Sequence, residues 1–174
     1  LGMENYRQLF SPDTELGRWL ATRNTMLRIG RNLFVHAGLS ARLLERDLEM
    51  DTLNARMSEG LYRTSKERRE DPTLEFLYRS AGPVWYRGMV CTDEKYDPLT
   101  PEQTDALLRR YDADRLLVGH TIFPDISTFH DGRVIAVNVQ NELNRRKNRG
   151  RAVLIEGSRI SVVGNRGVKR VLEE

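Results

Sequence analysis

Hydrophobic residues recur at helical spacing in the first half of this chain and gather into short runs in the second half. Leu16, Trp19 and Leu20 fall on one face of a helix that begins near Ser11-Pro12-Asp13, where proline suits the first turn. Apolar residues at spacings of seven, three and four predict a second helix over residues 41–57. The first half is therefore expected to be mainly helical.

Two further helices have clear start signals. Asp71-Pro72 caps a short helix, because aspartate suits the cap position and proline the first turn. Thr100-Pro101-Glu102-Gln103 adds a capping-box glutamine to the same signals and predicts a helix to about Tyr111. Between these helices, residues 82–99 have no clean period and predict a structured loop. Residues 60–70 are mostly polar and predict a loop or a helix extension.

Short apolar runs bounded by turn residues predict the strands. They lie at residues 25–29, 33–36, 115–119, 126–129, 133–139, 152–155 and 160–163. Asp131-Gly132 and Gly157-Ser158 have the composition of hairpin turns, so the C-terminal strands are expected to be antiparallel. The mixture predicts an α/β (α+β) fold in which helices cover at least one face of a sheet.

Composition narrows the class of protein. A length of 174 residues suits one domain with a packed core, and no apolar run approaches the roughly 20 residues of a membrane span. The single cysteine, Cys91, excludes an internal disulfide framework and a cysteine-rich zinc site, and it suits cytoplasm or periplasm equally. The chain starts at Leu1 without an initiator Met or a signal-peptide pattern. We therefore expect the natural protein to extend beyond this N-terminus, and its location stays unassigned.

Basic residues concentrate in the C-terminal segment. The formal charge of the chain is +3, whereas residues 140–174 hold nine basic and four acidic residues. The run Arg145-Arg146-Lys147-Asn148-Arg149-Gly150-Arg151 suits a solvated loop, or a module that binds RNA or an acidic protein. Because no aromatic residue interrupts the run, we favour the solvated loop over a nucleic-acid site.

Two of the three histidines end predicted strands. His36 follows the apolar run at residues 33–35, and His120 follows the run at residues 116–119. Ligands gather at the carboxyl ends of strands in α/β sheets, and a neutral imidazole there can bind a transition metal. His36 and His120 are therefore candidate metal ligands, with hydrogen bonding at a strand end as the structural alternative. His130 adjoins a predicted turn and is expected to be exposed.

A second concentration of candidate chemistry is Gly82-Pro83-Val84-Trp85-Tyr86-Arg87-Gly88. Two aromatic residues stand beside an arginine in a segment bounded by glycines. Such a segment can fix a guanidinium so that it binds phosphate oxygens. Arg87 is therefore a candidate phosphate ligand, whereas packing on the core is a sufficient explanation for Trp85.

Four segments form an ordered set of motifs: Thr14-Glu15-Leu16-Gly17-Arg18-Trp19-Leu20, Leu33-Phe34-Val35-His36-Ala37-Gly38-Leu39-Ser40, Gly82-Pro83-Val84-Trp85-Tyr86-Arg87-Gly88 and Val118-Gly119-His120-Thr121. In this order and spacing they resemble the calcineurin-like metallophosphoesterases, and most of all the bacterial Shewanella-like branch of the phosphoprotein phosphatases. The resemblance implies a β-sandwich flanked by helices. It also implies a hydrolase in which two divalent cations (Mn, Fe or Zn), about 3.5–4 Å apart, activate a hydroxide that attacks phosphorus.

The resemblance assigns a role to each candidate. His36 corresponds to the metal-binding histidine of the family's HGG motif, and His120 to that of its GHT motif. In the family both histidines bind the same one of the two metals. Arg87 corresponds to the arginine that binds the substrate phosphate. The implied substrate is a phosphorylated protein, phosphotyrosine included, or a small phosphomonoester.

The chain also departs from the family. The motifs Asp-x-His, Gly-Asp-x-x-Asp-Arg-Gly and Gly-Asn-His-Glu are absent from the sequence, and Ala37 stands where glycine is commoner. We therefore expect residues 1–174 to be the C-terminal portion of a single metallophosphoesterase domain whose N-terminal strands are missing. Two imidazoles form at most a partial site, so the chain alone should bind metal weakly and hydrolyse little. Missing strands would leave an apolar edge or face uncovered, which favours self-association.

Two other functions fit the sequence. A catalytically degenerate phosphatase-like scaffold would lack the same motifs. A binding module would use the basic C-terminal segment on RNA or an acidic protein, with an affinity for RNA that falls as salt rises.

Overall fold

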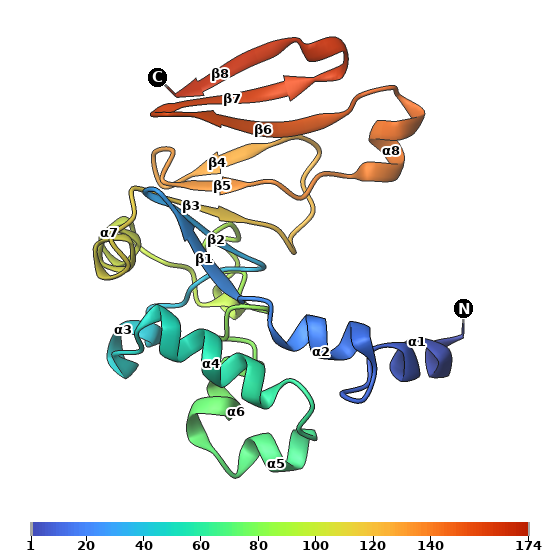
Figure 1. Cartoon of the computed structure of the whole chain (residues 1–174). Helices are drawn as coiled ribbons and strands as arrows, with labels where there is room; N and C mark the ends of the chain where they lie inside the picture. Colours follow the sequence, from blue (N-terminus) through green and yellow to red (C-terminus); the bar gives the residue numbers. More distant parts are fainter. Residues whose placement is uncertain (1, 174) are drawn as a thin grey trace.

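Two β-sheets and a group of helices make up the chain, and the computed structural model describes residues 2–173 (Figure 1). The first sheet has the order β1-β2-β3-β5-β4, and the second has the order β6-β7-β8. The strands of the first sheet are β1 (Met26–Ile29), β2 (Asn32–Val35), β3 (Arg115–Val118), β4 (Ser127–Phe129) and β5 (Val134–Ala136). Those of the second are β6 (Arg151–Glu156), β7 (Arg159–Gly164) and β8 (Lys169–Glu173).

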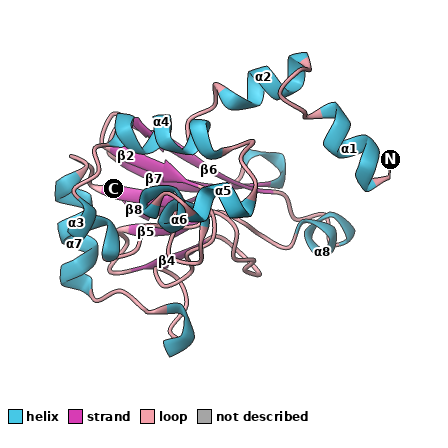
Figure 2. Ribbon diagram, turned by 90° about the horizontal axis from the view of Figure 1, so that it is seen from below, coloured by secondary structure: helices cyan, strands magenta, loops and turns pink. Residues whose placement is uncertain are grey.

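The helices lie mainly on one side of the first sheet, whereas α1 and α2 extend away from it in both views (Figures 1 and 2). They are α1 (Met3–Leu9), α2 (Glu15–Ala21), α3 (Arg42–Arg46), α4 (Met50–Gly60), α5 (Ser65–Arg69), α6 (Pro72–Tyr78), α7 (Pro101–Arg110) and α8 (Asn141–Arg146). Short 3-10 helices lie at η1 (Glu94–Tyr96) and η2 (Asn165–Gly167). Within residues 2–173, no helix combines the length and apolar character needed to cross a membrane.

Alternation along the central strands divides the interior into two apolar layers. Leu33 and Val35 of β2 pack against the helices, whereas Phe34 between them packs toward the second sheet. Leu116 and Leu117 of β3 divide in the same way. Successive side chains of a strand point to opposite faces, so the sheet is covered by helices on one face and by β6–β8 on the other. This confirms the mixed α/β class and the antiparallel C-terminal strands.

Both predicted caps form. The Asp71 side chain accepts hydrogen bonds from the backbone N–H groups of Thr73 and Leu74 and starts α6. Thr100 and Gln103 form a reciprocal capping box that starts α7. These two helices therefore begin where the residue types predict.

The single helix expected over residues 41–57 is wrong. The chain breaks at Asp47, whose φ of 48° is left-handed, and forms α3 and α4 instead. Tyr111 Oη donates to the Leu48 carbonyl at 3.0 Å, so a contact distant in sequence holds the break. The first predicted helix also starts later than expected, with Thr14 as its cap. On its apolar face Leu16 and Trp19 are exposed and Leu20 is half-buried.

The sequence patterns also miss α1, α5, α8 and β8. Thr64 and Glu67 form a capping box for α5, inside the segment expected to be a loop or a helix extension. The basic segment contains α8, where Arg146 pairs with Glu142, and Arg151 pairs with Asp125 at 2.8 Å. Part of its positive charge is therefore already paired.

The β1 end of the first sheet presents apolar surface to solvent. Leu27 and Ile29 of β1 are 42% and 61% exposed. An open cavity of about 600 Å³ lies over Leu27, Phe34 and Leu117, next to His36. This exposed surface agrees with the expected uncovered face. Self-association through it stays a prediction, against which a stable 20 kDa monomer on gel filtration would count.

Substitution of Leu116 tests how much the central strand contributes to stability. Leu116→Ala should lower the free energy of unfolding by about 2–5 kcal/mol, because the side chain is fully buried and its truncation leaves a cavity. Leu27→Ala is the matched control in an exposed edge strand and should cost less than about 1 kcal/mol. Urea denaturation followed by circular dichroism measures both, and equal losses would contradict the assigned core.

Candidate functional site

Parallel pairing of β2 with β3 brings the two predicted metal ligands together. Val35 is the register partner of Val118, so both strands end at the same edge of the sheet. His36 follows β2 directly, and His120 follows β3 after Gly119. The His36 Nε2 and His120 Nδ1 atoms are 3.1 Å apart. The structure thus joins two residues that the strand-end pattern singled out separately.

The backbone around His120 is held in an uncommon conformation. His120 has a φ of 59°, in the left-handed region that few non-glycine residues adopt. Gly119 N donates to the His36 carbonyl at 2.8 Å, and Thr121 N donates to the Gly119 carbonyl at 2.6 Å. These bonds fix the turn and so aim the imidazole of His120 toward His36.

The loop that carries Arg87 is attached to the segment after His36. The Pro83 carbonyl accepts hydrogen bonds from Ala37 N at 2.9 Å and Gly38 N at 3.3 Å. A side chain at Gly38 would approach the Tyr86 carbonyl to 3.0 Å, so glycine permits this contact. Ala37 is buried, so its methyl group fits where glycine is commoner in the family.

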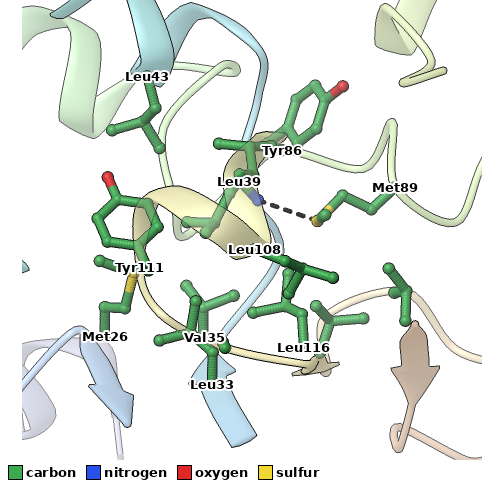
Figure 3. Packing of buried hydrophobic residues seen from close by; sticks show 14 of the residues in the cluster. Met26, Leu33, Val35, Leu39, Leu43, Tyr86, Met89, Leu108, Tyr111 and Leu116 are labelled. Atoms are coloured by element: carbon green, nitrogen blue, oxygen red, sulfur yellow. Dashed lines mark hydrogen bonds between the residues drawn. The ribbon is translucent and has the colours of Figure 1, made fainter. Parts of the chain in front are cut away.

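Residues beyond the site hold the same loop in place. Leu39 N donates to Met89 Sδ at 3.2 Å within the main core (Figure 3). Ser40 Oγ donates to the Ala81 carbonyl at 2.8 Å. The Tyr86 hydroxyl donates to the Asp97 carbonyl. Arg87 therefore extends from a segment anchored on both sides.

Arg87 and Trp85 both lie beside His120. Arg87 Nη1 donates weakly to Thr121 Oγ1 at 3.4 Å. The Trp85 ring meets the His120 ring edge to face, with centroids 5.4 Å apart, and the Trp85 residue is 55% exposed. The expectation that Trp85 packs on the core is therefore wrong. Its ring instead covers one side of the candidate site.

His130 has a structural role. Its Nδ1 lies 3.3 Å from Thr104 Oγ1 and its Nε2 lies 3.1 Å from the Met89 carbonyl. The ring is partly buried between α7 and the loop after Arg87, so the expectation of an exposed histidine is wrong. Its position beside a turn concealed these two contacts with distant segments.

Electrostatics favour a neutral His120. Burial lowers the pKa of His120, and the nearby Arg87 and His36 lower it further through charge repulsion. A neutral imidazole has one ring nitrogen with a free lone pair, which is the form that binds a metal. The surroundings of His120 therefore keep it available as a ligand near neutral pH.

The two ring nitrogens of His36 and His120 lie at hydrogen-bond distance, which is also the spacing of two ligands on one cation. Nitrogen ligands about 2.0–2.1 Å from a cation lie about 2.9–3.4 Å from each other, and the observed separation is 3.1 Å. His120 Nε2 is buried without a hydrogen-bond partner in the described part of the chain. Among residues 2–173, no group of three or more His, Cys, Asp or Glu could hold a metal. Metal binding by His36 and His120 stays a prediction.

Comparison with solved structures finds phosphatases. The cold-active protein-tyrosine phosphatase of a psychrophilic Shewanella species matches with a TM-score of 0.86 and 28% identity, over 97% of this chain and 48% of that protein. A further structure of a cold-active protein tyrosine phosphatase matches with a TM-score of 0.86 and 30% identity, over the same shares. A point mutant of a cold-active protein tyrosine phosphatase matches with a TM-score of 0.85 and 28% identity, over 97% of this chain and 48% of that protein. No protein-family model and no curated protein matches the chain.

These neighbours agree with the expected phosphatase and with a Shewanella link, whereas the calcineurin-like metallophosphoesterase class stays a prediction. At 30% identity the likeness extends beyond the general fold, and it includes nearly the whole of this chain. The chain spans about half the length of each of these neighbours.

Sequence patterns missed two features of the site. Thr121 was only part of a motif, yet its hydroxyl contacts Arg87. Tyr96 lies in a loop without periodicity, yet its ring centroid is 6.0 Å from Arg87 Cζ. The aromatic content of residues 82–99 was the only sequence signal for Tyr96, and it did not indicate where the Tyr96 ring would lie.

Proton titration tests this electrostatic environment. With metal removed by a chelator, the His120 imidazole should titrate below its ordinary pKa of about 6.5. The folded chain then binds this proton less readily than the unfolded chain, so stability falls as pH drops below about 6.5. Arg87→Gln should raise the pKa of His120, and Arg109→Gln on α7 should leave it unchanged. NMR of the imidazole protons measures the pKa of His120 in each variant. A pKa of His120 that is unchanged in Arg87→Gln would contradict the assigned influence of Arg87.

Proposed function

We propose that this chain is part of a metal-dependent phosphoesterase of the calcineurin-like class. In this proposal His36 and His120 bind one divalent cation, and Arg87 binds the phosphate of the substrate. The observation that carries it is the 3.1 Å approach of His36 Nε2 to His120 Nδ1 beside Arg87. The similarity to phosphatases over 97% of the chain supports the same assignment.

Each residue has a distinct task. Divalent cations, when bound, would supply the Lewis acid that activates water and polarises the phosphate. Arg87 supplies a planar guanidinium, which can form two parallel hydrogen bonds to phosphate oxygens. Trp85 shields His120 from one side, which strengthens electrostatic interactions there. The substrate is a phosphorylated protein, phosphotyrosine included, or a small phosphomonoester.

The remaining ligands belong to another segment in this proposal. Two neutral imidazoles lack the negative charge that holds a pair of divalent cations, and carboxylates supply it in two-metal sites. We propose that a segment of the natural protein outside residues 1–174 provides them. The match covers only 48% of the length of the structural neighbour, which is compatible with such a segment.

Hydrolysis of p-nitrophenyl phosphate with Mn²⁺ tests the function. The natural full-length protein should turn over substrate, and His36→Ala should abolish its metal-dependent rate. Arg87→Gln should lower kcat/KM by about 10²–10³-fold, because it removes a donor that stabilises charge in the transition state. Arg109→Gln should have the activity of the parent.

The 174-residue chain alone should show little or no turnover in the same assay. Robust Mn²⁺-dependent turnover that His36→Ala abolishes would contradict the partial site. A full-length protein that is inactive, or whose activity is unchanged by His36→Ala, would contradict the proposed function. Apo-protein circular dichroism verifies that each variant is folded.

A further inference from the structure

Arg87 also lines a groove whose lining does not include His36. It has a volume of about 500 Å³, and its lining includes Arg42, Trp85, Arg87, Lys95, Tyr96 and Asp97. Arg42 begins α3, and Lys95 and Tyr96 belong to η1. Three separate segments therefore build a groove that starts at the proposed phosphate ligand. We call it the Arg42–Tyr96 groove.

The charge of this groove is mainly positive. Arg42, Arg87 and Lys95 line it, against one carboxylate, Asp97. Arg42 is exposed, and its side chain forms no ion pair or hydrogen bond within residues 2–173. Lys95 contacts Asp93 at 2.8 Å in an exposed pair, which contributes little and is readily exchanged. An anionic ligand could therefore pair with Arg42 at no cost to an existing interaction.

Aromatic side chains also line the groove. Trp85 is more than half exposed, which is unusual for so large an apolar side chain. The centroid of the half-buried Tyr96 ring lies 4.8 Å from Lys95 Nζ and 6.0 Å from Arg87 Cζ. Tryptophan, tyrosine and arginine are the residues enriched at the centres of binding surfaces. The Trp85 and Tyr96 rings offer stacking surface for the ring of a tyrosyl phosphate.

We propose that the Arg42–Tyr96 groove binds the peptide around a phosphorylated residue and selects phosphotyrosyl peptides with acidic neighbouring side chains. Arg87 holds the phosphate, Trp85 and Tyr96 contact the aryl ring and backbone, and Arg42 and Lys95 pair with the flanking carboxylates. The inference rests on the proposed function, because it places the substrate phosphate at Arg87. It adds a preference among peptide substrates. A small phosphomonoester has no flanking residues and therefore cannot reveal this preference.

Fluorescence anisotropy of labelled peptides on the 174-residue chain tests the preference. One phosphotyrosyl peptide carries glutamates on both sides of the phosphotyrosine, and its partner carries glutamines. The acidic peptide should bind about three- to tenfold more tightly at low salt, and the difference should shrink as salt screens the charges. Equal affinities, or no detectable binding of either peptide, would overturn the inference.

Arg42 variants locate the preference in the groove. Arg42→Gln should lower the ratio of the two peptides' affinities at least twofold, whereas Arg109→Gln on α7 should leave this ratio unchanged. Arg42→Glu should shift the preference toward a peptide with flanking lysines. A ratio unchanged in both Arg42 variants would overturn the assignment. The exposure of Arg42 means that neither change removes a core contact, and thermal unfolding checks this.

Three further outcomes separate this inference from the proposed function. Arg87→Gln should weaken both phosphopeptides equally. If it does so while the two peptides bind alike, the proposed function stands and the groove assignment fails. If Arg87→Gln changes nothing, the phosphate site itself fails. If the unphosphorylated acidic peptide, or RNA of equal charge, binds as tightly, the groove is a general anion surface and the inference is overturned.

Discussion

The parallel pairing of β2 with β3 is the constraint on which the candidate site depends. These strands are distant in sequence, yet Leu33 pairs with Leu116 and Val35 with Val118. Residues after the two strands must then emerge at the same edge of the sheet. Because burial on both faces fixes the register, a slip of one residue would turn every apolar side chain to the wrong layer. Core packing therefore determines the separation of His36 and His120.

The loops at this edge complete the site in a second step. The Pro83 carbonyl connects the Arg87 loop to the segment after His36, and the turn at His120 is closed by its own backbone. These backbone hydrogen bonds hold the segments that carry Arg87, His36 and His120. The framework of the site therefore does not depend on long flexible side chains. Close contacts between loops thus position the candidate residues relative to one another.

Prediction from the sequence succeeded where a local pattern is sufficient. Apolar runs between turn residues predicted every described strand except β8, and the residue types at Asp71 and Thr100 predicted two helix starts. It failed where distant contacts decide, as at Asp47, where a left-handed residue splits an apparently continuous helix. The same is true of Trp85 and His130, whose neighbours come from other segments. A residue pattern identifies candidate ligands, whereas pairing of strands and loops decides which of them meet.

Mn²⁺ broadening of imidazole NMR signals tests most directly whether His36 and His120 share one cation. The chain has three histidines, so His130 serves as an internal control in the same sample. Substoichiometric Mn²⁺ should broaden the His36 and His120 signals together and leave the His130 signal sharp. In His36→Ala, the broadening of His120 should weaken strongly. Equal broadening of all three signals, or of only one of the pair, would contradict a shared site.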